Sequence, residues 1–458
     1  MNRKQRRLAA KQNRGTEKKV TLSDAVAMAI QLHQQGKLDE AEKIYQQVLQ
    51  VNSDHPDALH FYGVLSHQKG KHDLAVELIA KAIALNPDYS DAYNNLGNVF
   101  KEMGKLNEAE EAYQACLTRT PKNIDALSNL GAVLRENKKY PEALASLQQA
   151  IALAPDHSQA YHNLGNVYKK LNQFKEAIAA YRQSITLLHP SDPKAHVSAV
   201  FKSLSRTLYI QRDYKQVEIV LREWLAFDPT NPMASYMLSA CTGEDVPERA
   251  SDDYVEETFD EFAGSFDEIL KKLEYQAPEL VLSAVHDQLG SNTSQRVVLD
   301  AGCGTGLCGI LLRDYASHLT GVDLSKGMVD QARGRDIYDE LLVAELTGYM
   351  QKQESKFDLI VSADTLCYFG ELAEVLQAVS VALKHEGLFV FTLEKIIPID
   401  NQKAYQLNPH GRYSHAPDYV NTMIVDAGLH ILNIANETLR KEAGQAVEGM
   451  VVSVMKKA

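Results

Sequence analysis

The sequence predicts a two-part fold, in which an all-α superhelix of repeated helix pairs precedes an α/β domain with a mostly parallel sheet. Two observations carry this prediction. In the N-terminal half, small residues recur every 34 positions, which indicates a repeat architecture. In the C-terminal half, apolar runs alternate with segments of helical spacing. Such alternation indicates a parallel sheet that binds ligands at the carboxyl ends of its strands.

The N-terminal half consists of units of 34 residues. Each unit has a large apolar residue, a Leu-Gly pair, an alanine and a proline after its second helix. Small residues at the glycine and alanine positions let two helices approach, while the large residues fill the space between units. The recurring residues are Gly63, Gly97, Gly131 and Gly165; Ala41, Ala75, Ala109, Ala143 and Ala177; and Pro87, Pro121 and Pro155, and one complete copy is Tyr93, Leu96, Gly97, Phe100, Ala109, Tyr113 and Pro121.

This pattern resembles the tetratricopeptide repeat. Five regular units are expected between Thr21 and His189, and a sixth, looser unit extends to Pro229 with Tyr214 and Val217 in its second helix. A last helix over residues 231–241 is expected to cap the superhelix, because terminal units are usually atypical. The predicted array therefore spans residues 21–241, and the connection over 242–247 is the expected domain boundary.

Three asparagines recur just before the Leu-Gly pairs. In this repeat family the position faces the concave groove, where a column of amides can bond an extended peptide without reading its sequence. The central units resemble the arrays of O-linked sugar transferases, which carry such a ladder. The alternative is that the amides bond only within the array. The expected partner-binding residues are Asn95, Asn129 and Asn163.

A glycine cluster opens the C-terminal domain. Residues 297–306 read V-V-L-D-A-G-C-G-T-G, so an apolar run ends in an acid and alternate glycines follow, as in the first turn of a nucleotide-binding α/β fold. A dinucleotide turn requires G-x-G-x-x-G, but Leu307 stands at the third glycine position. Asp300 would repel a diphosphate, whereas it suits a site that faces a sulfonium and an ammonium group.

The pattern D-x-G-x-G-x-G resembles the signature of class-I S-adenosylmethionine-dependent methyltransferases. The resemblance implies a Rossmann-like domain with a seven-stranded sheet over residues 275–458, and S-adenosyl-L-methionine as methyl donor. Asp323 ends the next apolar run, where a carboxylate can accept hydrogen bonds from both ribose hydroxyls. The alternative is a glycine-rich turn in an ordinary α/β protein. The expected cofactor-binding residues are Asp300, Ala301, Gly302, Cys303, Gly304, Gly306, Asp323, Leu324, Glu345 and Asp364.

The later segments follow the family order. Residues 342–346 form the expected third strand, where Glu345 replaces the commoner aspartate that contacts the adenine amino group. Residues 357–362 form the fourth strand, 363–369 lie beside the methionine end and the substrate, 371–383 form a helix and 388–392 a strand. Residues 362–365 lack the Asn/Asp-Pro-Pro-aromatic run of enzymes that methylate DNA bases or glutamine amides, which argues against both acceptors.

No catalytic residue is identified from the sequence. Methyl transfer needs a base only when the nucleophile starts protonated. The candidates are Asp364 and, in the loop from His410 to His415, Tyr413 and His415. The alternative is that Arg412 and the two histidines of this loop, His410 and His415, are surface loop residues.

Residues 242–274 are expected to form a linker and a helix that caps the cofactor. Phe259, Phe262 and Phe266 follow one another at three- and four-residue steps, so they share one face of a single helix. Related methyltransferases use such a helix to exclude water. The alternative is that the aromatic stripe packs on the neighbouring domain.

Composition is that of a globular protein without a membrane span or a secretory leader: of 458 residues, 45% are hydrophobic. The five cysteines lack metal-ligand spacing, so no metal is expected and a reducing cytoplasm is the expected location. Residues 1–19 hold eight Lys or Arg and one Glu, and 1–20 are expected to be a disordered tail that can touch RNA or an acidic surface, or alternatively a transit peptide. The net charge of −12 argues against DNA binding by the folded part.

The sequence therefore predicts S-adenosylmethionine-dependent methyl transfer to an unidentified acceptor, with the array recruiting a protein partner or substrate. The design resembles that of bacterial methyltransferases with tetratricopeptide repeats. Two alternatives stay open: a repeat scaffold whose methyltransferase-like domain binds cofactor without turnover, and a small-molecule methyltransferase whose repeats serve only assembly.

Overall fold

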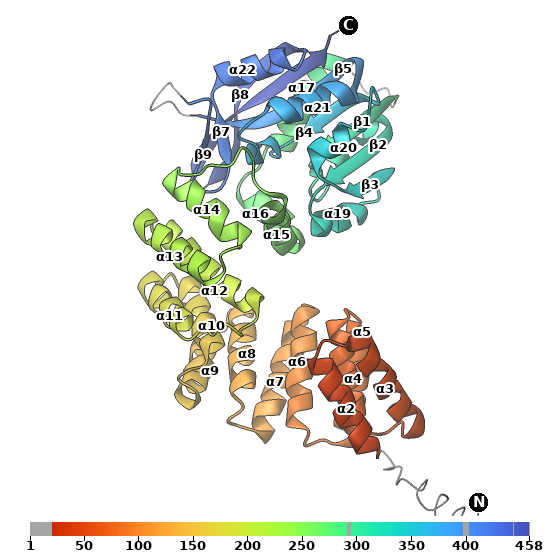
Figure 1. Ribbon diagram of the computed structural model, residues 1–458, viewed down its shortest axis with the longest axis vertical. Coiled ribbons are helices and arrows are strands. Elements are labelled where there is room, and N and C mark those ends of the chain that lie inside the picture. Colours follow the sequence, from red (N-terminus) through yellow and green to blue (C-terminus); the bar gives the residue numbers. More distant parts are fainter. Residues whose placement is uncertain (1–20, 291–294, 397–402, 443, 458) are drawn as a thin grey trace, which may run out of the picture. The chain divides into compact units, whose positions relative to one another are not determined.

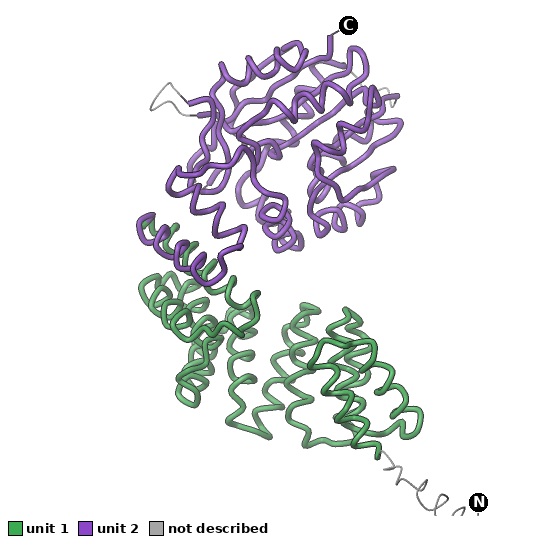
Figure 2. The backbone as a smooth tube through the Cα atoms, in the orientation of Figure 1, with its two compact units in different colours: residues 1–213 green, residues 214–458 purple. Residues whose placement is uncertain are grey.

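The computed structural model describes residues 21–290, 295–396, 403–442 and 444–457. The chain divides into two compact units, residues 1–213 and 214–458, which Figure 2 colours separately. The basic segment 1–20, expected as a disordered tail, lies outside the described residues.

Helices make up the regular structure of the described part of the first unit. Successive helices pack in pairs, and each pair is one of the five regular units predicted. The pairs are α2 with α3, α4 with α5, α6 with α7, α8 with α9 and α10 with α11. The helices, shown in Figure 1, are α2 (Leu22–Gln34), α3 (Leu38–Val51), α4 (Pro56–Gln68), α5 (His72–Leu85), α6 (Ser90–Glu102), α7 (Leu106–Arg119), α8 (Ile124–Glu136), α9 (Tyr140–Leu153), α10 (Ser158–Lys170), α11 (Phe174–Thr186) and α12 (Lys194–Ile210).

The recurring glycines bring the two helices of a pair together. A Cβ atom added at Gly97 would lie 2.6 Å from the ring of Tyr113, and one at Gly165 would lie 2.5 Å from the ring of Tyr181. Both tyrosine rings are completely buried. Glycine is therefore required by close packing at these positions, because any side chain would displace a core aromatic group.

The helices of the expected sixth unit are assigned to different compact units. Helix α12 belongs to the first unit, whereas α13 (Tyr214–Phe227) and α14 (Pro232–Thr242) belong to the second. Helix α14 coincides with the expected terminal helix, and Asn231 caps it by accepting a hydrogen bond from the backbone N–H of Ala234 at 3.0 Å. Helix α14 packs against both α13 and α15. The boundary between the two compact units, 213/214, therefore lies 28 residues before the domain boundary expected at 241/242. The expected domain boundary stays a prediction.

A nine-stranded sheet forms the centre of the second unit. Strands β3, β2, β1, β4 and β5 are parallel in that order, β9 pairs antiparallel with β5, and β8 pairs antiparallel with β9. The resemblance implied seven strands; the two additional ones are the three-residue strands β6 and β7, which extend the sheet beside the end of β5. The strands are β1 (Arg296–Ala301), β2 (Ala316–Asp323), β3 (Glu340–Val343), β4 (Phe357–Ser362), β5 (Leu383–Lys395), β6 (Tyr405–Leu407), β7 (Tyr413–His415), β8 (Leu429–Glu442) and β9 (Gln445–Lys456).

Helices cover both faces of this sheet (Figure 1). Alternate residues of β1 serve opposite cores: Val298 packs with residues of α17 and α18, and Leu299 packs with residues of α20, α21 and α22. The remaining helical elements are α15 (Asp252–Phe262), η1 (Ala263–Ser265), α16 (Phe266–Lys272), α17 (Ala277–Leu289), α18 (Leu307–Leu312), η2 (Arg313–Tyr315), α19 (Lys326–Arg333), α20 (Leu346–Met350), η3 (Leu366–Tyr368), α21 (Ala373–Ala382) and α22 (Pro417–Asp426).

In the part of the chain that the structure describes, no helix has both the length and the apolar character needed to cross a bilayer.

Candidate functional site

The glycine turn between β1 and α18 has a backbone that requires glycine. Gly302, Gly304 and Gly306 have φ values of +78°, +52° and +91°, which disfavour any side chain. A Cβ atom at Gly302 would also lie 2.1 Å from Oγ1 of Thr365, whereas one at Gly304 would meet only the ring of Phe266 at 3.9 Å. The face of Gly304 is therefore open enough for a ligand to approach the backbone.

Asp323, at the end of β2, is joined directly to this turn. Its carboxylate accepts hydrogen bonds from the backbone N–H of Gly304 at 2.9 Å and of Ser325 at 2.9 Å. Burial raises the pKa of Asp323, while the backbone donors oppose that rise. Asp323 and the neighbouring Leu324 are half-buried, so Asp323 keeps some solvent exposure beside the glycine turn.

Asp300 lies inside the fold rather than at an open surface. It is 1% exposed, and the hydroxyl of Tyr338 donates a hydrogen bond to its carboxylate at 2.6 Å. Burial raises the pKa of Asp300 to about 7. The adjoining Ala301 and Cys303 are also buried, and the Cys303 N–H bonds the carbonyl of Val322 at 3.0 Å. These residues shape the turn from within.

The expected capping helix consists of two helices, α15 and α16, joined by the 3-10 turn η1. The prediction of one continuous helical face for Phe259, Phe262 and Phe266 is therefore wrong, because the chain changes direction at residues 263–265. The ring of Phe259 still contacts that of Phe266, with centroids 6.0 Å apart, and that of Tyr368, at 5.4 Å.

Two carboxylates fasten this capping segment to the loops around the glycine turn. Asp260 accepts hydrogen bonds from the Ser325 hydroxyl at 2.5 Å and from the Gly327 N–H at 2.8 Å. Asp267 accepts one from the Thr305 hydroxyl at 2.6 Å and pairs with Arg335. The segment thus holds both the glycine turn and the loop after Asp323, as a cover over the site must.

Glu345 caps a helix. Its side chain accepts hydrogen bonds from the backbone N–H groups of Thr347 at 2.9 Å and Gly348 at 2.6 Å, at the start of α20. Both carboxylate oxygens are thus used by the backbone. The expected contact with an adenine amino group would have to use the remaining lone pairs, and it stays a prediction.

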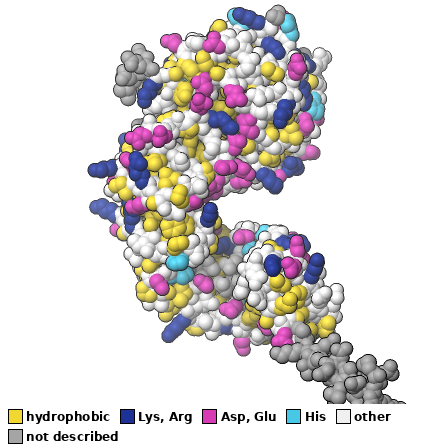
Figure 3. Space-filling view, in the orientation of Figure 1, with side chains coloured by type: hydrophobic (Ala, Val, Ile, Leu, Met, Phe, Trp, Pro, Cys, Tyr) yellow, Lys and Arg dark blue, Asp and Glu magenta, His cyan; other side chains and the backbone are white. Residues whose placement is uncertain are grey.

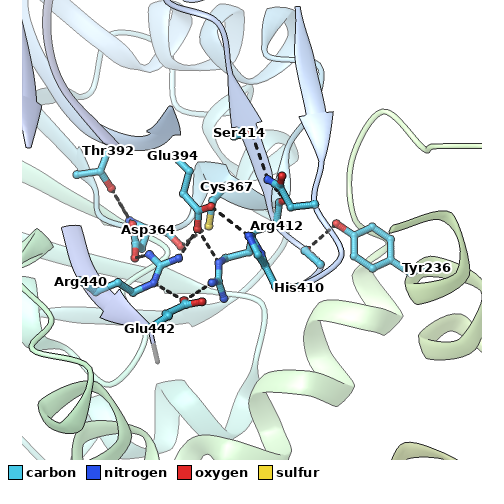
Figure 4. Close-up of polar contacts among 12 residues, drawn as sticks. Tyr236, Asp364, Cys367, Thr392, Glu394, His410, Arg412, Ser414, Arg440 and Glu442 are labelled. Carbon is cyan, nitrogen blue, oxygen red and sulfur yellow. Dashed lines mark hydrogen bonds and ion pairs between the residues drawn. The ribbon is translucent and has the colours of Figure 1, made fainter. Parts of the chain in front are cut away.

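Asp364 belongs to a cluster of charged groups that Figure 4 shows in detail. Arg440, only 3% exposed, pairs with Asp364, Glu394 and Glu442, and Arg412 pairs with Glu394 and Glu442. Burial raises the pKa of Asp364 despite the opposing charge of Arg440. For Glu394, burial is outweighed by Arg412 and Arg440, which lower its pKa. Asp364 is an ion-pair partner here, with its N–H bonded to the hydroxyl of Thr392 at 2.8 Å.

Tyr413 and His415 lie on β7 with no exposed surface. The Tyr413 hydroxyl donates to the carbonyl of Pro247 at 2.6 Å, and Nε2 of His415 lies 3.2 Å from the carbonyl of Gly370. Burial lowers the pKa of His415 to about 4. Of the three candidate bases, only Asp364 adjoins the charged cluster, and the two β7 residues are held in the core. The alternative of a surface loop is wrong for His415, because this residue is buried on β7, which pairs with β5 and β6.

Several residues that shape the site were not predicted as functional. Asp260 and Asp267 are seven positions apart, but the 3-10 turn over residues 263–265 lies between them, so helical spacing does not relate their side chains. Tyr338 packs against three glycines: a Cβ atom would lie 2.4 Å from its ring at Gly309, 2.8 Å at Gly321 and 3.1 Å at Gly306. Nothing in the local sequence of Tyr338 indicates that contact, because it joins segments far apart in the chain.

The three asparagines of the array make hydrogen bonds within it. Asn95 Nδ2 lies 2.8 Å from Nε2 of His60, Asn129 donates to Asn98 at 3.1 Å, and Asn163 donates to the hydroxyl of Ser128 at 3.1 Å. Asn163 is buried, while Asn95 and Asn129 are half-buried. Their role toward a partner stays a prediction.

Family models match both parts of the chain. A methyltransferase-domain model matches residues 299–391, from β1 to β5, and so includes the glycine turn and Asp364. Tetratricopeptide-repeat models match residues 32–97, 90–123 and 123–188. The two predicted parts are therefore each recognised by their own family.

Curated relatives that are named as methyltransferases match less than a third of this chain. A Geobacillus protein assigned to the methyltransferases is 29% identical over 150 residues, which are 31% of this chain and 60% of that protein. The malonyl-[acyl-carrier protein] O-methyltransferase of Acetivibrio thermocellus is 30% identical over 23% of this chain and 38% of its own. The 18S rRNA (guanine-N(7))-methyltransferase of Bos taurus is 25% identical over 29% and 45%. The chain thus spans less than two thirds of the length of these relatives.

Solved structures match one part of the chain at a time. A tetratricopeptide-repeat protein from Thermus thermophilus is 22% identical and covers 39% of this chain and 99% of its own, with a TM-score of 0.34. A SAM-dependent methyltransferase from Methanosarcina mazei is 18% identical over 38% and 97%, with a TM-score of 0.32. The family matches, together with the fold described above, identify the chain as a tetratricopeptide-repeat protein with a C-terminal domain of the methyltransferase family.

Proposed function

We propose that the second unit binds S-adenosyl-L-methionine and transfers its methyl group to an acceptor that the repeat array recruits through a protein. The observation that carries this proposal is the open backbone of Gly304 directly beside the Asp323 carboxylate, with the capping segment fastened to both loops by Asp260 and Asp267. This arrangement offers an apolar and aromatic cover, a carboxylate and exposed backbone within one small region.

The residues present fit this cofactor. In the proposal the turn Gly302, Gly304 and Gly306 receives the amino-acid portion, the carboxylate of Asp323 accepts the ribose hydroxyls, and Leu324 and Glu345 border the adenine. Bound there, the cofactor supplies a methyl group on a sulfonium, which is already activated for in-line displacement. The side chains of Asp300, Ala301 and Cys303 are buried, so in the proposal they support the turn from inside the fold.

The chain's own residues would act mainly by positioning and by excluding water. Phe259, Phe266 and Tyr368 form a connected aromatic group next to the glycine turn. The candidate bases are engaged elsewhere: Asp364 in ion pairs with Arg440, and Tyr413 and His415 in the core. We therefore infer an acceptor that needs no dedicated base, that is, a nucleophile already deprotonated near neutral pH.

A carboxylate attached to a carrier protein has both properties required here, since it is anionic at neutral pH and is presented by a protein. Two of the curated relatives, from Acetivibrio thermocellus and Salmonella typhimurium, are named malonyl-[acyl-carrier protein] O-methyltransferases. Their names support this acceptor class for the present chain, and the repeat array supplies a surface for the protein that bears it.

Calorimetric titration of S-adenosyl-L-methionine into the full-length protein tests the cofactor site. Replacing Asp323→Ala removes the proposed ribose contacts, each worth about 1.5–3 kcal/mol when charge-assisted, so we expect affinity to fall by at least tenfold. The matched control is Asp330→Ala, which removes an exposed carboxylate of α19 paired with Lys326 and Arg333. It should bind like the wild type.

Transfer is tested with cofactor labelled in its methyl group and cell lysate separated by molecular size. Label in the protein fraction that base treatment releases as a volatile alcohol would support a carboxylate acceptor on a protein. Label confined to small molecules would favour a repeat array used only for assembly. Cofactor binding without transfer to any fraction would favour a cofactor-binding scaffold, and absence of binding by the wild type would refute the proposal.

A further inference from the structure

Two histidines and a glutamate meet where three helices of the array adjoin. His67 lies near the end of α4, His72 begins α5 and Glu102 ends α6. Nδ1 of His67 lies 3.0 Å from Nδ1 of His72, and Nε2 of His67 lies 3.4 Å from the Glu102 carboxylate. Each of the three residues offers one ligand atom within 4.8 Å of the other two. The group therefore joins two successive repeat units.

His72 departs from the repeat at a position that is otherwise apolar. The equivalent residues at intervals of 34 are Leu38, Leu106, Tyr140 and Phe174, and each begins the second helix of its unit. Three of them, Leu38, Leu106 and Tyr140, are half-buried against the hydrophobic clusters of the array. The second unit thus replaces an apolar packing residue by an imidazole, and that imidazole faces another imidazole rather than the core.

The donor set is that of a transition-metal site. Two imidazole nitrogens and one carboxylate oxygen are ligands that Zn²⁺ and related divalent ions accept, and a set of two histidines and one glutamate leaves a coordination position open. The facing nitrogens are separated by about the distance that two ligands of one ion require. His67 is 15% exposed at its side chain and Glu102 58%, so one side of the group is open to solvent and its carboxylate can reorient.

We infer that His67, His72 and Glu102 bind a divalent transition-metal ion of the zinc class. The two histidines would ligate through their facing Nδ1 atoms. The exposed carboxylate of Glu102, which lies beside Nε2 of His67, would reorient to complete the set, with water in the open position. The ion would link α6 of the third unit to α4 and α5 of the second. Binding should therefore raise the thermal stability of the array, because an ion that binds only the folded chain favours it by mass action.

Titration of Zn²⁺ into chelator-treated full-length protein tests this site, with calorimetry and thermal unfolding by circular dichroism as the two readouts. We expect one saturable site and a higher melting temperature with Zn²⁺. His72→Leu installs the residue found in the first and third units, so the fold should be retained. We expect Zn²⁺ affinity to drop by at least about tenfold and the Zn²⁺-dependent shift in melting temperature to vanish.

Two further variants complete the test. Glu102→Gln keeps the shape of the side chain while removing its charge, and it should weaken Zn²⁺ binding less than His72→Leu. His189→Gln alters an exposed histidine of the same unit of the molecule and should bind like the wild type. Unchanged Zn²⁺ affinity in His72→Leu, or no saturable binding by the wild type, would overturn the inference. Neither readout involves S-adenosyl-L-methionine, so the result is independent of the proposed methyl transfer.

Discussion

The repeat array and the methyltransferase domain require glycine for different physical reasons. In the array, Gly131 is helical and is needed only because a Cβ atom would lie 2.5 Å from Cγ of Leu147. In the domain, Gly302 is needed twice, for its φ of +78° and because a Cβ atom would strike Thr365. Neighbouring contacts within a repeat thus determine the first region, whereas a special backbone and distant partners determine the second. A substitution at the neighbouring Leu147 can therefore relieve the destabilisation caused at Gly131, whereas no neighbour can relieve the backbone strain at Gly302.

The largest change in the free energy of unfolding is expected when a buried charged group is replaced. Replacing Arg440→Met leaves Asp364 and Glu394 without their shared cation, and loss of one partner of a buried ion pair typically costs about 3–5 kcal/mol. Urea unfolding can be followed through Trp224, the single tryptophan, which is buried in the second unit. The matched control is Arg222→Met, whose exposed pair with Glu218 is expected to contribute about 0–1 kcal/mol. Equal losses in the two variants would contradict a buried, interdependent cluster.

Glycine substitutions come next and test the comparison directly. Both Gly131→Ala and Gly302→Ala should destabilise by about 1–3 kcal/mol through overpacking, with about 1–2 kcal/mol more at Gly302 for a left-handed alanine. In double-mutant cycles, Leu147→Ala should relieve most of the cost of Gly131→Ala. Thr365→Ala should relieve less of the cost of Gly302→Ala, because the backbone strain persists. Equal relief at both sites would show that packing alone accounts for the glycine turn.

A pH-dependent difference in stability is expected at Asp300, because each unit by which the folded pKa exceeds the unfolded pKa corresponds to about 1.4 kcal/mol. Burial raises the folded pKa of Asp300 to about 7, so the folded state binds the proton more tightly than the unfolded chain. The resulting stabilisation is present below the unfolded pKa of 3.8 and is lost as the pH rises through about 7.

Asp300→Asn should therefore be more stable than the wild type at pH 8, with the advantage decreasing as the pH falls toward 4. Urea unfolding at four pH values, again followed by Trp224 fluorescence, measures the difference. A pH-independent difference would show that Asp300 does not titrate in this range. Tyr338→Phe is a useful companion, because it removes the hydroxyl that donates to Asp300 and leaves the packing ring in place.

The smallest effect concerns the asparagines of the array. Asn163→Ala removes a buried donor and leaves the Ser128 hydroxyl without that partner, which should cost about 1 kcal/mol. Asn95→Ala acts at a half-buried position where water can replace the amide, so its cost should be smaller. Thermal unfolding by circular dichroism compares the two. A larger loss for Asn95→Ala would indicate that the half-buried amide has the more important structural contacts.

The repeat units, the glycine turn and the succession of strands β1, β2, β4 and β5 along the chain can be predicted from the sequence. These features depend on local spacing: 34-residue periodicity fixes which small residue faces which large one, and alternate glycines after an apolar run specify a turn. The expected fourth strand, for example, has the same bounds as β4. The third strand is expected over 342–346, but β3 ends at Val343 because Glu345 caps the next helix. Local patterns were less informative for the capping segment, where a 3-10 turn interrupts a helical periodicity that continues across it.

The packing of segments distant in the chain determines which charged groups share a site. The carboxylates at 364 and 394 and the guanidinium groups at 412 and 440 come from four separate segments, and no spacing in the sequence relates them. The same holds for Tyr338 and Asp300. Tyr413 and His415 are candidates for catalysis by residue type alone, but both are buried on β7. A residue's chemistry follows from its type, but its partners, solvent exposure and pKa follow from the packing of segments distant in the chain.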